Sequence, residues 1–326
     1  MKKVVIVGPG GLGGLVAALL ARSAESCQVT VVTRLGPHAE AIRRDGLRLG
    51  GLDEFTVQLD VVDDARQIER CDALILAVKA QDTAAALERV AHIQVNDFVA
   101  SLQNGTIKDG VLADAFGRDK TIGGVAILAA ERPQPGVINW TYDGGTQFGE
   151  LDGTRSARVD WIVNLFRQSG LSAEATESIV SATWSKMVGW IPIGLFATLA
   201  RRTNAQIMSD PRIAREYTAI VRELRGLADS KGIALTNIGP YHVDEWTRVS
   251  AERAVELVMS SPLAGSQSTH SAFQDVQKGL ATEFSACIGP MLEDARIRAV
   301  PLTKTEALYA ALMGLEDSLE ERAESS

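Results

Sequence analysis

The sequence predicts an α/β protein in which an amino-terminal parallel sheet with helices on both faces is followed by an all-helical carboxy-terminal domain. Three observations predict this fold class. In the first half, short continuous apolar runs alternate with helical patterns, which is typical of a parallel sheet buried on both faces. After Thr176 most windows have the helical period and few β-branched runs. The length of 326 residues is enough for two domains.

The expected elements follow this pattern in order. Buried strands are predicted at residues 4–7, 29–33, 73–78 and 98–102, with further strands at 121–128, 137–142 and 146–149. Helices are predicted after the first strand and over 39–45 and 83–91, with an antiparallel excursion over 46–62 around Gly50-Gly51. Later helices are predicted at 180–199, 210–231, 241–259, 273–286 and 303–314. We therefore expect domains at 1–177 and 178–315 and a solvated acidic tail at 316–326.

Composition and charge argue against several classes of function. Apolar residues make up 46% of the chain and charged residues 23%, which are ordinary globular values. The net charge of −8 disfavours nucleic-acid binding, because an acidic surface repels phosphate backbones. Three widely spaced cysteines predict neither a disulfide framework nor a metal site. Residues 4–21 are uncharged but are interrupted by five glycines and Pro9, so we expect a cytoplasmic protein with no membrane partner.

A glycine-rich turn stands between the first predicted strand and the following helix. Its sequence, Gly8-Pro9-Gly10-Gly11-Leu12-Gly13, has the spacing G-x-G-x-x-G, which is a weak signal alone and a much stronger one in this position. Gly8 allows the tight turn, Gly10 lets the backbone approach a pyrophosphate, and Gly13 lets helix and strand pack closely. The helix start offers free N–H groups to the phosphates. The turn predicts a Rossmann-type dinucleotide site; the alternative is a glycine turn without a ligand.

Charged and amide side chains follow three of the predicted strands. Arg34 stands where folds that prefer NAD usually place Asp or Glu, and a guanidinium can hold the 2′-phosphate of NADP. We therefore predict NADP(H), the alternative being a solvated arginine. Lys79 and Asn104 follow two more buried strands. Because ligands of open α/β sheets bind at the carboxyl edge, we expect both residues there, although each alone could be a solvated or loop-capping side chain.

Lys186 is the only charged residue between Glu177 and Arg201. On a helix, its neighbours three, four, seven and eight positions later are uncharged: Gly189, Trp190, Ile193 and Gly194. Desolvation on such an apolar face lowers the pKa of a lysine towards neutral, which suits a general acid. The alternative is a lysine whose ammonium reaches solvent.

A polar cluster covers residues 269–275 and 278–283. Within it, Ser271 and Glu283 would lie about 120° out of phase on one regular helix. They can converge on one site only if the segment is not a single straight helix, with Ser271 before its start or Gly279 loosening it. The alternative is an N-terminal cap and an exposed acid.

Taken together, these residues resemble the ketopantoate reductase (2-dehydropantoate 2-reductase) family over nearly the whole chain. The resemblance rests on the glycine turn, Arg34, Val78-Lys79-Ala80-Gln81, Gln103-Asn104-Gly105, Trp184-Ser185-Lys186 and the block from Ser271 to Glu283. It implies an NADP-binding Rossmann domain, a helical domain, an active site in the cleft between them, and a homodimer. It also implies cofactor contacts from Lys79, Gln81, Asn104, Ala129 and Glu283, substrate contacts from Asn104, Asn204 and Ser271, and Lys186 as proton donor to the carbonyl oxygen.

The chain departs from this family pattern beyond the lysine. The family usually has asparagines four and eight residues after it, both facing the substrate, where this chain has Trp190 and Gly194. Pro192 between them is expected to kink the helix. An indole and a void in place of two amides favour a carbonyl substrate with a more apolar or aromatic body over ketopantoate.

The sequence therefore predicts an NADPH-dependent reductase of a 2-keto acid or related carbonyl compound. Lys186 would protonate the developing alkoxide, and Glu283 would hold the lysine in place. Trp190 would instead favour an imine or opine-type reductase, or a hydroxy-acid dehydrogenase, on the same machinery. A non-catalytic NADPH sensor would bind cofactor without turnover. A role in pantothenate biosynthesis depends on the substrate.

Overall fold

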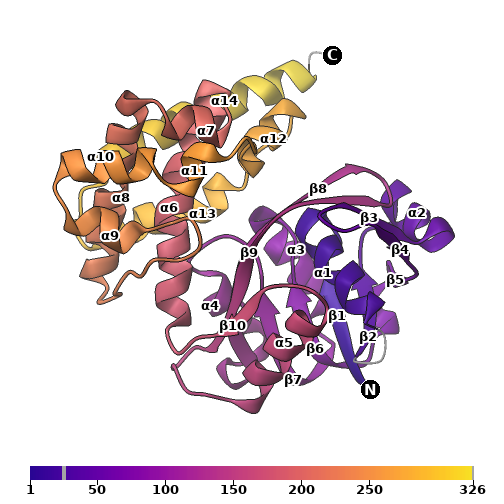
Figure 1. The fold of residues 1–326 in the computed structure, drawn as a ribbon. Helices are drawn as coiled ribbons and strands as arrows, with labels where there is room; N and C mark the ends of the chain where they lie inside the picture. Colours follow the sequence, from indigo (N-terminus) through magenta and orange to yellow (C-terminus); the bar gives the residue numbers. More distant parts are fainter. Residues whose placement is uncertain (24–26, 325–326) are drawn as a thin grey trace. The chain divides into compact units, whose positions relative to one another are not determined.

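The computed structural model describes residues 1–23 and 27–324 of the chain. The chain divides into two compact units, Met1–Ile179 and Val180–Ser326 (Figure 1). The division lies two residues after Glu177, where the hydrophobic pattern of the sequence changes from alternating to helical. The first unit holds the sheet, and the second is helical.

The described part of the first unit contains one ten-stranded sheet in the order β4-β3-β9-β8-β7-β6-β1-β2-β5, with β10 beside β9. The strands are β1 (Lys2–Val7), β2 (Cys27–Val32), β3 (Leu47–Gly51), β4 (Phe55–Val57), β5 (Asp60–Val62), β6 (Arg70–Leu76), β7 (Gln94–Ser101), β8 (Thr121–Gln134), β9 (Val137–Glu150) and β10 (Ala173–Ala175). Strands β7, β6, β1, β2 and β5 pair in parallel, so their carboxyl ends share one edge. The four predicted buried strands are confirmed.

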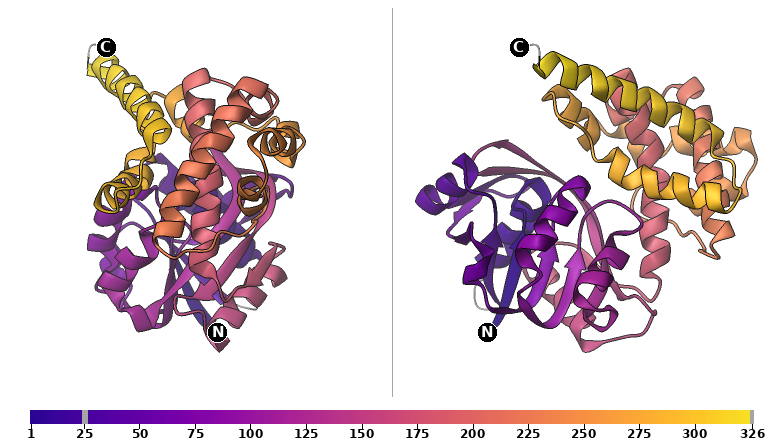
Figure 2. Two further views of the ribbon diagram at one scale, coloured as in Figure 1. Left: turned by 90° about the vertical axis from the view of Figure 1, so that its left-hand side faces the viewer. Right: turned by 180° about the vertical axis from the view of Figure 1, so that it is seen from behind.

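Helices cover both faces of this sheet (Figures 1 and 2). Val4 and Ile6 of β1 pack with α1 (Gly11–Arg22) and α5 (Ala157–Gln168) on one face. Val5 and Val7 point the other way and pack with α3 (Thr83–Val90) and α4 (Lys108–Phe116). The remaining helical segments are α2 (Pro37–Asp45), η1 (Ala65–Gln67), η2 (Ala80–Asp82) and η3 (Arg118–Lys120). Helices α4 and α5 were not predicted from the sequence.

Two expectations about strands change. The antiparallel excursion exists as the pair β3 and β4, but the chain reverses after Gly51 instead of around Gly50-Gly51. Gly51 has a φ of +96°, and a Cβ there would lie 2.0 Å from the Trp140 carbonyl oxygen of β9, so close strand pairing requires glycine. Residues 137–149 form one strand, β9, instead of two, because its partner β8 is equally long.

The second unit consists of helices joined by short turns. They are α6 (Ile179–Ala200), α7 (Asn204–Met208), α8 (Pro211–Ser230), α9 (Val243–Arg248), α10 (Ala251–Met259), α11 (Pro262–Gly265), α12 (Ser271–Gln277), α13 (Phe284–Ile297) and α14 (Thr303–Glu324). Helix α6 continues through Pro192 as one element. The helix predicted over 241–259 is two helices, because the Ser250 hydroxyl accepts from the Arg253 N–H and starts α10.

The helix predicted over 273–286 is wrong. Helix α12 ends at Gln277, Gly279 takes a φ of +69°, and α13 begins at Phe284. The left-handed conformation at Gly279 lets the chain leave the first helix, as residues with a Cβ rarely can. This break is the one that Ser271 and Glu283 need if they are to converge.

The acidic segment expected at 316–326 is helical in its described part, and its first residue is not solvated. Helix α14 continues to Glu324, and Glu316 is buried within it. The Glu316 carboxylate accepts hydrogen bonds from the Thr282 N–H at 3.0 Å and the Thr282 hydroxyl at 2.5 Å. These two hydrogen bonds offset the cost of burying the carboxylate, so this glutamate can lie inside the fold.

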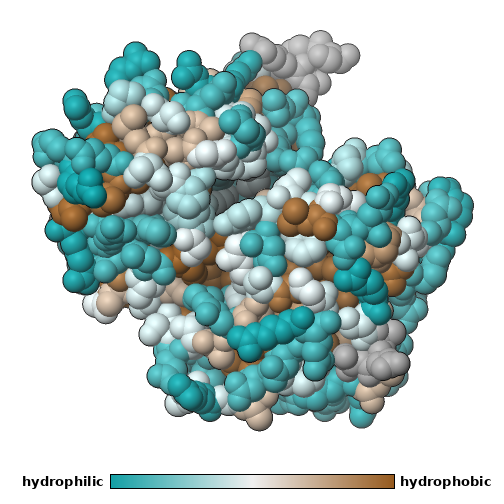
Figure 3. Space-filling model, in the orientation of Figure 1, coloured by the Kyte–Doolittle hydropathy of each residue, from teal (hydrophilic) through white to brown (hydrophobic). Residues whose placement is uncertain are grey.

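Among residues 1–23 and 27–324, one helix is long and apolar enough to cross a membrane. Residues 4–21 form parts of β1 and α1. Helix α6 has the length and apolar composition of a membrane span, and 83% of its 18-residue apolar window is buried inside the protein. On the face seen in Figure 3, hydrophilic residues cover most of the surface and apolar residues form separate patches.

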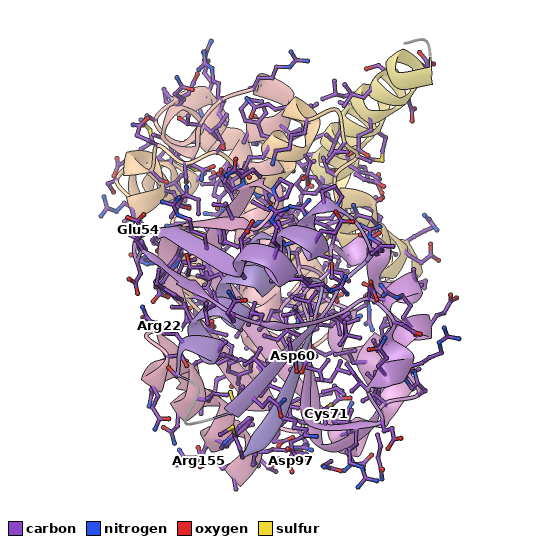
Figure 4. The ribbon with its side chains drawn as sticks, turned by 90° about the vertical axis from the view of Figure 1, so that its right-hand side faces the viewer. Arg22, Glu54, Asp60, Cys71, Asp97 and Arg155 are labelled. Atoms are coloured by element: carbon purple, nitrogen blue, oxygen red, sulfur yellow. The ribbon has the colours of Figure 1, made fainter. Side chains whose placement is uncertain are left out.

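The amino-terminal edge of the sheet carries ion pairs and a buried thiol. Cys71, near the start of β6, and Asp97, in β7, lie toward the same end of the sheet (Figure 4). The Lys2 Nζ lies 2.8 Å from Asp97 Oδ2. Burial raises the pKa of Cys71 to about 12, which keeps it a thiol at neutral pH. These groups lie at the edge opposite the glycine turn.

Candidate active site

The glycine turn connects β1 to α1, as the sequence predicts. Gly8 has a φ of +88°, and a Cβ there would lie 2.5 Å from Val78 Cγ1. At Gly13 a Cβ would lie 2.2 Å from the Gly8 carbonyl oxygen and 2.9 Å from Ala77 Cβ. These two glycines are therefore required by the packing of the turn itself.

Gly10 differs from these two glycines, because a Cβ there would meet nothing within 4 Å. Gly10 is also the N-cap of α1 and makes no side-chain cap hydrogen bond, so no side chain occupies the start of the helix. The first N–H groups of a helix lack intrahelical partners and attract anions. Open space beside those groups fits the pyrophosphate of a dinucleotide.

The hairpin of β8 and β9 packs against the start of α1, beside the glycine turn. A Cβ at Gly11 would lie 2.2 Å from the Ala130 carbonyl oxygen, so α1 begins directly against β8. Ala129, the residue expected near the nicotinamide, is the neighbour of this contact and is half-buried. The structure thus brings Ala129 to the same region as the glycine turn. Leu12, the fifth residue of the turn, is also half-buried.

His38, which the sequence analysis missed, ties the turn to this hairpin. Its Nε2 lies 2.7 Å from the Pro9 carbonyl oxygen, and its Nδ1 accepts from the Gly136 N–H at 2.9 Å. Burial lowers the pKa of His38, so the ring is neutral and can donate through Nε2 while it accepts through Nδ1. A histidine just inside the second helix gave no recognisable signal, because its partners are both backbone groups distant in sequence.

The strand ends place three predicted residues at the same edge as the turn. Arg34 follows β2, Lys79 follows β6 and Asn104 follows β7. Arg34 has a side chain 83% exposed, with its Nη2 4.0 Å from Asp82 Oδ2. Gln81 is exposed in η2. The guanidinium therefore lies in an open position, where it is accessible to a phosphate.

A buried glutamine holds two of these strand ends together. Gln103 Nε2 donates to the Lys79 carbonyl oxygen at 3.3 Å and to the Thr83 hydroxyl at 2.8 Å, and Gln103 Oε1 accepts from the Ser101 hydroxyl at 2.9 Å. The amide thus links the loop after β6 to the loop after β7. Gln103 belongs to the motif Gln103-Asn104-Gly105, and its sequence neighbours do not indicate this role.

In the second unit, Lys186 lies on α6 and is only 8% exposed. One turn later, the Trp190 ring lies 4.5 Å from the His270 ring and 5.2 Å from the Phe284 ring, measured between centroids. His270 directly precedes Ser271, and Phe284 directly follows Glu283. We call Trp190, His270 and Phe284 the ring cluster. It brings together α6 and the starts of α12 and α13, the three segments that carry Lys186, Ser271 and Glu283.

This arrangement corrects two alternatives weighed for the polar cluster. Glu283 is 4% exposed, so it is a buried acid instead of an exposed one. The side chain that caps α12 is His270, whose Nδ1 accepts from the Ala272 N–H at 3.2 Å, and Ser271 is the first residue of the helix. Ser271 is therefore not the N-cap of α12, and Glu283, at the N-cap position of α13, is not exposed.

The void expected at Gly194 is also wrong. A Cβ at this position would lie 2.4 Å from His270 Cε1 and 2.6 Å from Phe284 Cζ, so two rings fill the space beside the glycine. Trp190, the other departure from the family pattern, is buried against the same rings. The α6 face beyond Lys186 is therefore lined by aromatic groups.

Asn204 begins α7 after a capping box formed by Thr203 and Gln206. Its Nδ2 donates to the Ser268 hydroxyl at 3.1 Å. Its Oδ1 is buried and has no hydrogen-bond partner among residues 1–23 and 27–324. A buried acceptor of this kind is costly unless a ligand or water completes it.

The described residues contain no group of three or more His, Cys, Asp or Glu side chains that could hold a metal ion. In the second unit, Lys186 and Glu283 are both buried.

Comparisons with known proteins cover both units. Residues 4–153 match the family model described as ketopantoate reductase PanE/ApbA, and residues 178–316 match the model of its C-terminal part. A 2-dehydropantoate 2-reductase from Halobacterium salinarum is 28% identical over 309 residues, covering 94% of this chain and 96% of that protein.

Two solved structures share the fold over almost the whole chain. The 2-dehydropantoate 2-reductase from Geobacter metallireducens is 24% identical with a TM-score of 0.82, covering 96% of this chain and 99% of that one. A D-mandelate dehydrogenase with NADH and anilino(oxo)acetate is 18% identical with a TM-score of 0.85, covering 98% and 99%. The chain belongs to the ketopantoate reductase family of NADP(H)-dependent oxidoreductases.

Proposed function

We propose that this protein reduces the carbonyl group of a 2-keto acid to a hydroxyl group, with Lys186 as the proton donor. One observation carries the proposal: Lys186 is buried on α6, and the ring cluster gathers the segments of Ser271 and Glu283 around the same helix. Burial disfavours the charged form of an ammonium, which suits an acid that must release a proton near neutral pH. Glu283 would orient the lysine.

The chemistry needs one group from outside the chain. Bound NADPH supplies the hydride that reduces the carbonyl carbon. The Lys186 ammonium gives its proton to the carbonyl oxygen and becomes a neutral amine, and the product is a 2-hydroxy acid. Before it transfers the proton, the same ammonium stabilises the negative charge that develops on that oxygen.

The first unit would bind the cofactor through the carboxyl edge of the sheet. We call this edge, with the turn Gly8–Gly13 and the strand ends at Arg34, Lys79 and Asn104, the glycine edge. The backbone from Gly8 to Gly13 would hold the pyrophosphate, and Arg34 would hold the 2′-phosphate. The contacts proposed for Lys79, Gln81, Asn104 and Ala129 follow from the same edge, with Glu283 as a further contact from the second unit. The open space at Gly10 and the exposed Arg34 guanidinium support this assignment.

The second unit would bind the substrate. Ser271 and Asn204 would contact it from α12 and α7, and Asn104 from the first unit. The Asn204 Oδ1, which has no hydrogen-bond partner among the described residues, supports this role, because the hydroxyl group of the 2-hydroxy acid product could donate to it. The names of the relatives contain 2-dehydropantoate, and a structural neighbour is named for mandelate, so both keto acids and hydroxy acids define the class to test. A homodimer and a cytoplasmic location stay predictions.

The test is the oxidation of NADPH in the presence of 2-keto acids, with and without an added amine. We expect turnover without the amine, and Lys186→Ala should lower kcat by about 10²–10⁴-fold while NADPH still binds, as measured by nucleotide fluorescence. Lys304→Ala, which changes an exposed lysine of α14 paired with Glu216, is the matched control and should leave kcat unchanged. Near-normal turnover by Lys186→Ala, or turnover that requires an amine, would contradict the proposal.

A further inference from the structure

Gly194, which stands where the family pattern has asparagine, packs against His270 from another segment of the chain. A Cβ at residue 194 would lie 2.7 Å from His270 Nε2 as well as 2.4 Å from its Cε1. Any side chain on α6 at this position would overlap the imidazole. Glycine at 194 is therefore required while the His270 ring and the Phe284 ring, whose Cζ would lie 2.6 Å from such a Cβ, keep their places.

The His270 ring has a defined tautomer. Its Nδ1 accepts from the Ala272 N–H at 3.2 Å, so the neutral ring carries its proton on Nε2. The imidazole therefore presents an N–H donor on the edge that lies against Gly194. An asparagine amide would offer its own N–H donor from nearly the same place on α6.

The ring cluster lies on the face of α6 that carries Lys186. Trp190 and Gly194 follow the lysine by four and eight residues, which is the spacing of one helix face. The His270 and Phe284 rings are nearly parallel, at 13°, with centroids 6.0 Å apart, and the Trp190 ring leans against both. The Trp190 and Phe284 rings thus pack directly against the imidazole.

From this geometry, and resting on the function proposed above, we propose that His270 is the specificity-determining residue of the second unit. Its Nε2–H takes the substrate contact that an asparagine on α6 would otherwise make. Trp190 and Phe284 provide flat apolar walls beside it. The site would therefore select 2-keto acids with an aromatic body over those with a hydroxylated aliphatic body, because aromatic rings pack well against such walls and a hydroxyl would lose its amide partners.

The test compares phenylpyruvate with ketopantoate as substrates for four forms of the full-length protein. These are the wild type, His270→Ser, Gly194→Asn, and the double variant Gly194→Asn/His270→Ser. We expect the wild type to prefer phenylpyruvate in kcat/KM. His270→Ser should lower kcat/KM for phenylpyruvate about tenfold, mainly through KM, with the Kd of NADPH unchanged. The double variant should shift the ratio of the two substrates towards ketopantoate by about tenfold or more.

The single variant Gly194→Asn tests the packing argument separately. It should lower the thermal unfolding temperature, and adding His270→Ser should restore part of the loss, because the overlap with the imidazole is then removed while that with Phe284 remains. If the double variant fails to fold, His270→Ser and His270→Gln decide the question, since Gln can replace the lost donor and should recover part of the phenylpyruvate activity.

The outcomes separate this inference from the proposed function. If the wild type reduces neither keto acid, the proposed function fails. If it reduces them but His270→Ser and the double variant leave the substrate ratio unchanged, only the role of His270 is overturned. A wild-type preference for ketopantoate would overturn the selection for an aromatic body.

Discussion

The glycine edge of the first unit and the ring cluster of the second are built in different ways. The glycine edge depends on backbone atoms in close approach, such as Gly13 against the Gly8 carbonyl oxygen and Gly11 against the Ala130 carbonyl oxygen. The ring cluster depends on side chains from three helices distant in sequence. A backbone contact leaves glycine as the only choice at its position, whereas packed side chains can be exchanged in compensating pairs. We therefore expect the first unit to be intolerant of single changes and the second to be adaptable.

The largest expected effect tests the intolerance of the glycine edge. Gly13→Ala would place a Cβ 2.2 Å from the Gly8 carbonyl oxygen, which only a shift of α1 away from β1 could relieve. We expect it to lower the free energy of unfolding by about 3 kcal/mol and to abolish NADPH binding. Chemical unfolding and nucleotide fluorescence measure the two effects.

Gly10→Ala is the matched control within the same turn. A Cβ at Gly10 meets nothing within 4 Å, and its φ of −72° suits alanine, so stability should not change. The methyl group would occupy the space assigned to the pyrophosphate, and the Kd of NADPH should rise about tenfold or more. Equal stability of the two variants would show that close packing at Gly13 is not what fixes this turn.

An intermediate effect concerns the carboxylate that supports the start of α13. Glu316→Ala would leave both donors of Thr282 without their acceptor, and we expect a loss of about 2 kcal/mol in unfolding free energy. Glu316→Gln keeps one acceptor oxygen and should lose only about 1 kcal/mol. Because Thr282 directly precedes Glu283, kcat should fall in the same order.

The comparison between the two Glu316 variants separates two explanations. If both lost the same stability, the negative charge rather than the hydrogen-bond acceptor would be the important feature. If neither lost stability, the second unit would be adaptable even at this buried contact, and the start of α13 would be held by the ring cluster alone.

The features that could be predicted from the sequence are those that depend on local patterns. The glycine turn, the strands that end at Lys79 and Asn104, and the carboxyl edge that they share follow from the alternation of apolar runs with helical periods. Gly279 also indicated a break in the helical segment, and in the structure α12 ends just before it. The long helical stretch around it was predicted as continuous, because helical periodicity persists across a short turn.

The features that could not be predicted depend on contacts between distant segments. Gln103 and His38 act through backbone groups of other loops, and nothing in their own neighbourhoods indicates these partners. The space beside Gly194 was predicted to be empty because the sequence could not place His270 against α6. Glu316 was assigned to a tail because a run of glutamates is typical of solvated segments, and only Thr282 explains its burial.

The smallest expected effect probes Arg34, an exposed charged side chain of the glycine edge. Arg34→Asp should raise the Kd of NADPH about tenfold, or 1.4 kcal/mol, and leave that of NADH nearly unchanged. The effect is limited because the Arg34 side chain is 83% exposed, so solvent screens its attraction to a phosphate. Arg66→Ala, at an equally exposed arginine paired with Asp64, is the control and should change neither affinity. Equal losses for both nucleotides would mean that Arg34 does not distinguish them. The backbone of the glycine turn would then be the main determinant of cofactor binding by the first unit, and the contrast with the side-chain cluster of the second unit would be sharper still.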